Sequence, residues 1–64
     1  MTTTPETQRY LDAAAAVRIV DERGAENREQ AAVAWLHEAG YYAGLTGDEE
    51  RHLDAMVREA CETI

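Results

Sequence analysis

The chain has 64 residues, of which 45% are hydrophobic, and a formal net charge of −7. The chain has one cysteine, so it cannot form an internal disulfide. It has six arginines, no lysine and thirteen acidic residues, so it lacks the basic patch that binding to nucleic acids or anionic membranes requires. We therefore expect a soluble cytoplasmic protein with a protein partner and with neither direct nucleic-acid binding nor membrane association.

The hydrophobic residues are mostly small. Twelve of them are alanines, and phenylalanine is absent. Because alanine buries little surface, a chain of this length and composition gains stability by associating, and we expect a homodimer. The negative charge suits a basic partner, but an acidic surface also serves solubility or adaptation to high salt.

The first predicted helix covers residues 5–23, after a flexible segment of residues 1–4. Thr4 has the side chain of an N-cap, and Pro5 suits the first helical position. Gly24 fits the residue that follows a helix C-terminus, where a left-handed backbone is common.

This helix carries two apolar lines instead of one. The first is expected to face the core and consists of Tyr10, Ala13, Ala14, Val17 and Val20. The second, Leu11, Ala15 and Ile19, has i, i+4, i+8 spacing and lies on another side. Since a surface helix needs only one apolar face, the second line predicts contact with another molecule. The alternative is that both lines are covered within one chain.

The second predicted helix covers residues 27–39. Asn27 is its expected N-cap, and Gly40 is expected to end it. Its apolar stripe, with i, i+3, i+4, i+7 spacing, consists of Ala32, Trp35, Leu36 and Ala39.

The third predicted helix covers residues 47–63 and begins with the capping-box pattern Thr46-x-x-Glu49. Its apolar face consists of Leu53, Met56, Val57, Ala60, Cys61 and Ile64. Asp54 and Arg58 are expected to form an ion pair on the opposite face. Residues 5–64 should thus form one all-α domain, a small three-helix bundle that we expect to dimerise.

Two adjacent tyrosines, Tyr41 and Tyr42, lie in the glycine-containing segment between the second and third helices. Neighbouring side chains of an irregular segment point to different sides, so we expect one tyrosine to close the core with Trp35 and Leu45 and the other to stay accessible. Trp35, Tyr41 and Tyr42 therefore form a second candidate partner-binding surface, beside the line Leu11, Ala15 and Ile19.

The residues that could carry chemistry give weak signals. Glu49-x-x-His52 places a carboxylate and an imidazole on one helix face, as metal-binding helical bundles do, but further ligands would have to come from a second copy. His37 is expected to be solvated, and Cys61 to be packed beside acidic neighbours that raise its pKa. We expect no enzymatic activity, cofactor or metal, with an oligomeric metal-binding protein that uses Glu49 and His52 kept as an alternative.

Another alternative is a DNA-mimicking inhibitor, such as a phage protein, because carboxylates spaced along helices imitate phosphates. The acidic residues gather at the two turns and comprise Asp21, Glu22, Glu26, Glu29, Asp48, Glu49 and Glu50. Our main hypothesis is a small acidic protein-interaction module, such as a regulator, an accessory subunit or an antitoxin-like binder, that acts through an apolar helix face.

Overall fold

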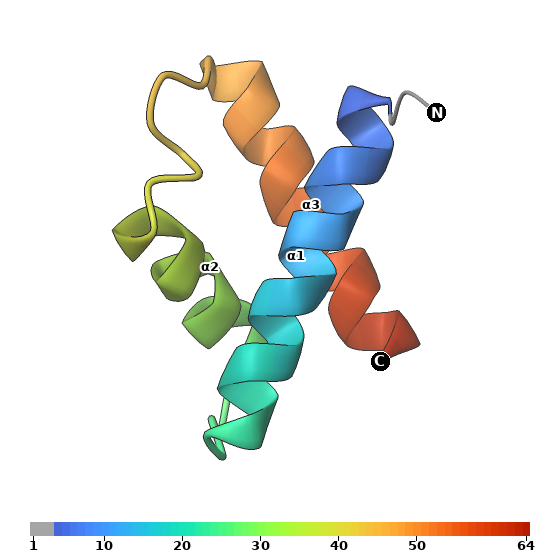
Figure 1. Cartoon of the computed structure of the whole chain (residues 1–64), viewed down its shortest axis with the longest axis vertical. Coiled ribbons are helices and arrows are strands. Elements are labelled where there is room, and N and C mark those ends of the chain that lie inside the picture. The colour runs from blue at the N-terminus through green and yellow to red at the C-terminus, as the bar shows by residue number, and fades with distance from the viewer. Residues whose placement is uncertain (1–3) are drawn as a thin grey trace.

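The computed structural model describes residues 4–64, which form three helices: α1 (Pro5–Glu22), α2 (Arg28–Glu38) and α3 (Gly47–Thr63) (Figure 1). No strand occurs within this part of the chain. The predicted all-α, three-helix architecture is confirmed, and each predicted boundary agrees to within one residue. The predicted flexibility of residues 1–3 lies outside the described residues.

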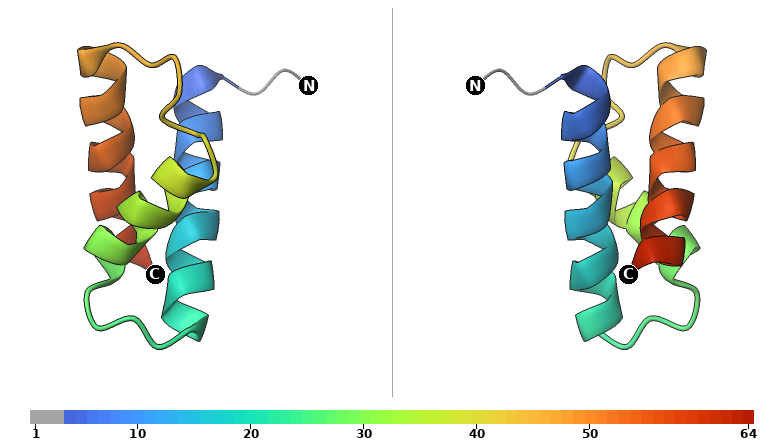
Figure 2. Two further views of the ribbon diagram at one scale, coloured as in Figure 1. Left: turned by 90° about the vertical axis from the view of Figure 1, so that its left-hand side faces the viewer. Right: turned by 90° about the vertical axis from the view of Figure 1, so that its right-hand side faces the viewer.

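The three helices all contact one another. α1 and α3 run side by side in the same direction, and α2 returns in the opposite sense across both of them (Figure 2). The radius of gyration is 11.1 Å, and the principal extents are 31 × 24 × 17 Å. Among the helices described, none has both the length and the hydrophobicity that crossing a bilayer requires.

Each helix begins at the N-cap that the sequence predicts. The Thr4 hydroxyl accepts a hydrogen bond from the Thr7 backbone N–H at 3.2 Å, and Asn27 Oδ1 accepts one from the Gln30 N–H at 3.1 Å. Thr46 and Glu49 form the full capping box, in which each side chain accepts from the other residue's N–H at 3.2 Å. These bonds satisfy backbone donors that a helix start leaves free.

α1 and α2 end in the same way, at a glycine with a positive φ. Gly24 has φ 79° and Gly40 has φ 87°. The N–H of Ala25 donates to the Val20 carbonyl at 3.1 Å, and the N–H of Tyr41 donates to the Leu36 carbonyl at 3.0 Å. This is the Schellman arrangement, which ends both helices and turns the chain sharply.

The core is a single cluster between the three helices. Its largest fully buried side chains are Leu36, Val17 and Val57, and the full set is Ala13, Ala14, Ala16, Val17, Val20, Ala32, Leu36, Tyr42, Leu53, Val57 and Ala60. Ala16 joins the predicted inner line of α1. Ala39 was predicted to be apolar-facing but is exposed, because the helix has ended there and the chain turns away from the core.

Candidate functional site

The outer line of α1 remains uncovered within the chain. Leu11 is 52% exposed, Ala15 is exposed and Ile19 is partly buried. The alternative that neighbouring helices cover both lines of α1 is therefore wrong for Leu11 and Ala15. Leu11 is one of three large hydrophobic residues in the described chain with this degree of exposure, together with Tyr41 and Ile64.

Trp35 and Tyr41 form an aromatic pair at the C-terminal end of α2. Their ring centroids are 6.0 Å apart, and the ring planes are inclined by 27°. Tyr41 is 42% exposed, whereas Trp35 is partly buried against the core. The two residues line an open hollow of about 320 Å³, together with Ala39 and Gly40.

Tyr42 has a different environment from its neighbour. It is 7% exposed and belongs to the core, so the prediction of one closing and one accessible tyrosine is confirmed. Its ring stacks on His37, with centroids 3.9 Å apart and planes 8° from parallel, and its hydroxyl donates to Asp54 Oδ1. Tyr42 is therefore not part of the candidate partner-binding surface. Trp35 pairs with the exposed Tyr41 and not with the buried Tyr42.

Burial is the main cause that raises the pKa of Tyr42 far above its ordinary value of 10.0. The hydrogen bond to Asp54 and the negative charges of Asp54 and Glu50 raise this pKa further. The phenol thus stays protonated and keeps donating its hydrogen bond over the whole physiological range.

Ile19 of the outer line and Trp35 of the aromatic pair lie on the same side of the bundle. Tyr10 lines a hollow with residues of α3, and Ile19, nine residues or about two and a half turns later, lies on the opposite side of α1. Val33 lines a hollow with Asp54 of α3, and Trp35 lies about 200° further around α2. Ile19 and Trp35 thus both face away from α3, on the side formed by α1 and α2.

Glu49 and His52, the candidate metal pair, contact an arginine from another helix. Arg9 Nη2 donates to Glu49 Oε2 at 2.7 Å, and Arg9 Nη1 lies 3.1 Å from His52 Nδ1. Because arginine can only donate, Nδ1 of His52 is the acceptor of this contact. A permanent positive charge between these two side chains is a poor neighbour for a metal ion. Residues 4–64 contain no group of three or more metal-ligating side chains.

Glu49 also takes part in the capping box, and this contact dominates its titration. The hydrogen bonds from Thr46 lower the pKa of the Glu49 carboxyl, and the charge of Arg9 lowers it further, whereas desolvation opposes them. The residue therefore has a structural role at the start of α3 in the single chain.

Arg28 connects all three helices at the other end of the bundle. Its Nη2 donates to the Cys61 carbonyl near the end of α3 at 3.0 Å, and its Nη1 lies 3.9 Å from Asp21 in α1. The last turn of α3 has no basic residue of its own, so Arg28 supplies the positive charge that favours a helix C-terminus.

The thiol of Cys61 is partly buried. Burial raises its pKa, Glu29 and Glu62 raise it further, and the charge of Arg28 acts in the opposite direction. The pKa of Cys61 is thus raised, as predicted, but the contribution of Glu29 from α2 was not predicted. A thiol in this state is a weak nucleophile at neutral pH.

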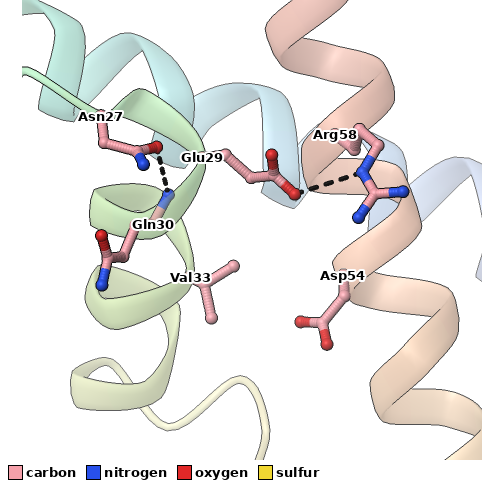
Figure 3. A pocket seen from close by; sticks show the side chains of 6 residues that line it. All are labelled: Asn27, Glu29, Gln30, Val33, Asp54 and Arg58. Atoms are coloured by element: carbon pink, nitrogen blue, oxygen red, sulfur yellow. Dashed lines mark hydrogen bonds and ion pairs between the residues drawn. The ribbon is translucent and has the colours of Figure 1, made fainter.

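An open hollow of 340 Å³ lies between α2 and α3 (Figure 3), and its lining residues are Asn27, Glu29, Gln30, Val33, Asp54 and Arg58. Arg58 Nε donates to Glu29 Oε1 at 3.3 Å, and Asp54 accepts from Tyr42. The predicted ion pair between Asp54 and Arg58 is therefore wrong, because each side chain has a partner outside α3. Arg58 thus joins α3 to α2, and Asp54 joins α3 to the segment that follows α2.

Sequence reasoning missed Arg9 and Arg28, although both carried a signal. Arg9 continues the core-facing line of Ala13 and Ala16 by one helical turn, and Arg28 stands one turn before Ala32. A charged residue in register with an apolar line needs a partner at the edge of the core, because an unpaired buried charge is costly. The spacing thus indicates that Arg9 and Arg28 each need a partner, but it does not identify that partner.

Comparison of the chain with protein-family models, with curated proteins and with solved structures gave no match.

Proposed function

We propose that this protein is a protein-interaction module that pairs with a second copy through the outer line of α1. The observation that carries the proposal is the exposure of Leu11, 52% accessible on a line that continues through exposed Ala15 to partly buried Ile19. The three residues of the line are apolar, so contact along it would remove apolar surface from water.

The composition of the core supports association. Five of its eleven residues are alanines, and only Leu36, Val17 and Val57 are large, fully buried side chains. Small domains bury a low fraction of their surface and often gain stability from oligomerisation. Covering Leu11 would add more apolar burial than any alanine of the core contributes.

The test measures molar mass by light scattering behind size exclusion, at low and at high salt. We expect a dimer at both salt concentrations, because an apolar contact is insensitive to screening. Leu11→Glu should convert it to a monomer. Leu11 is the best position for the change because it is the large exposed side chain of the line, whereas Ile19→Glu would also disturb packing inside the chain.

Ala55→Glu serves as the matched control. Ala55 is exposed on α3, so this variant adds the same charge on another helix and should remain a dimer. A wild-type protein that is monomeric at all concentrations and salts would overturn the proposal, and so would a Leu11→Glu variant that stays dimeric.

The two alternatives have less support. The DNA-mimic hypothesis depends on acidic residues at the turns, but Asp21, Glu29, Asp48 and Glu49 have arginine partners within the chain. A complex of that kind would weaken sharply with added salt. The metal hypothesis requires a metal ion to displace Arg9 from Glu49 and His52.

A further inference from the structure

We propose that the aromatic pair Trp35 and Tyr41, at the C-terminal end of α2, docks an arginine side chain of a partner protein. This surface is distinct from the outer line of α1, and neither proposal depends on the other. The hollow that the two rings line, together with Ala39 and Gly40, has a volume of 320 Å³. It is open to solvent and large enough for a guanidinium group.

The aromatic rings supply the first part of the recognition. Tyr41 is 42% exposed, Trp35 is only partly buried, and both residues line the hollow. A guanidinium is planar and weakly hydrated and stacks on aromatic faces, with tryptophan the most favourable of them. An aliphatic or neutral polar side chain would gain less from the same surface.

The end of α2 supplies the second part. Within residues 4–64, the carbonyls of Trp35, Leu36 and His37 accept from backbone N–H groups, whereas none donates to the carbonyls of Glu38 and Ala39. These two free acceptors lie at the negative end of the helix dipole. A guanidinium has five N–H donors and can therefore bond the carbonyls while its plane rests on a ring.

Charge supplies the third part. Glu38 is exposed and stands three residues after Trp35, which makes the two side chains neighbours on the helix surface. No basic residue lines the hollow, and the chain carries a net charge of −7. An incoming cation is thus attracted at long range and meets no like charge at the contact.

The test uses Trp35 as its reporter, because it is the only tryptophan of the chain. The full-length protein is titrated with a short peptide of alternating arginine and glycine, with the same peptide containing citrulline, and with its lysine version. We expect a saturable change of Trp35 fluorescence with the arginine peptide, a weaker one with lysine, and none with citrulline, which keeps the shape but lacks the charge.

Four variants separate this site from general attraction to an acidic protein. Tyr41→Leu keeps net charge and apolar packing but removes the ring, and should weaken binding about two- to fivefold, whereas Tyr41→Phe should bind as the wild type. Glu38→Gln should weaken binding, and Glu59→Gln, which removes one exposed charge from α3, should have less effect.

Equal responses to the arginine and citrulline peptides would overturn the proposal. It would also fail if Tyr41→Leu bound like the wild type, or if Glu38→Gln and Glu59→Gln weakened binding equally, since the attraction would then be to net charge alone. Tyr41 is exposed and outside the core, so these variants are expected to fold.

Discussion

Tyr42 shows how one residue fastens an irregular segment to a helical bundle. Its ring lies against His37 at the end of α2, and its hydroxyl reaches Asp54 in the middle of α3. The segment between these helices has two glycines with positive φ, Gly40 and Gly44, and its backbone hydrogen bonds are those of turns, from Ala43 N–H to Gly40 and from Leu45 N–H to Tyr42. One buried aromatic with one polar contact therefore fixes a connection that backbone bonds alone would leave loose.

Tyr42→Phe should destabilise the protein by about 1 kcal/mol at neutral pH, because the hydrogen bond to a charged acceptor is lost while the ring remains. This loss of free energy is small for a hydrogen bond to a charged acceptor, because Asp54 is exposed to solvent. Urea unfolding of the variant and the wild type measures the difference. Identical free energies of unfolding would contradict a stabilising role for the contact.

The raised pKa of Tyr42 also predicts a pH dependence. Because the folded state holds this proton more tightly than the unfolded state, the contribution is fully present below pH 10.0 and is lost as the pH rises above it. The wild type should lose more stability than Tyr42→Phe between neutral pH and about pH 11, measured by urea unfolding across that range.

At the scale of the helix, local rules predicted the boundaries well and the long-range partners poorly. Thr4, Asn27 and Thr46 cap the helices, and Gly24 and Gly40 end α1 and α2, because each contact is made by residues close in sequence. These positions could be read from spacing alone.

The pair Asp54 and Arg58 illustrates the limit of local rules. Their i, i+4 spacing is favourable for an isolated helix, but an exposed pair of this kind is worth only about 0.3–0.5 kcal/mol. Contacts across the bundle with Tyr42 and Glu29 replace it. The packing of the helices decides which side chains meet across the bundle, and the sequence periodicity does not predict these partners.

The start of α3 should be sensitive to acid. The pKa of Glu49 is lowered in the folded state, so its contribution to stability is present above pH 4.5 and is lost as the pH falls below it. Glu49→Gln keeps an acceptor for the Thr46 N–H but no longer titrates. Its melting temperature should therefore fall less between neutral pH and about pH 3.5 than that of the wild type.

Glu59→Gln is the matched control for this experiment. Glu59 is an exposed carboxylate of the same helix, and the variant removes the same charge. It should retain the acid sensitivity of the wild type. An equal loss in all three proteins would mean that Glu49 has no special part in the acid response.

At the scale of the whole molecule, charged contacts fasten both ends of a small core. Arg9 joins α1 to the start of α3, and Arg28 joins α2 to the ends of the other two helices. The periodicity predicted three helices, the core-facing line of α1 and the exposed outer line. It did not predict that Tyr42 would be the buried tyrosine, because this depends on the turn at Gly40 and on the position of Asp54.

Dimerisation through the outer line of α1 would make thermal stability depend on concentration. The melting temperature of the wild type should rise by several degrees over about a hundredfold increase in protein concentration, because association stabilises the folded state by mass action. Leu11→Glu should melt at one temperature throughout. Differential scanning calorimetry measures both, and a wild-type value independent of concentration would contradict pairing.

The turns at Gly24 and Gly40 also have a stereochemical consequence. With φ near 80°, both residues occupy the half of conformational space that L-amino acids avoid and that their mirror images prefer. The backbone thus reverses its handedness at the end of α1 and again at the end of α2. In a chemically synthesised chain, D-alanine would suit these two positions, because it favours the required φ and restricts the unfolded chain more than glycine does.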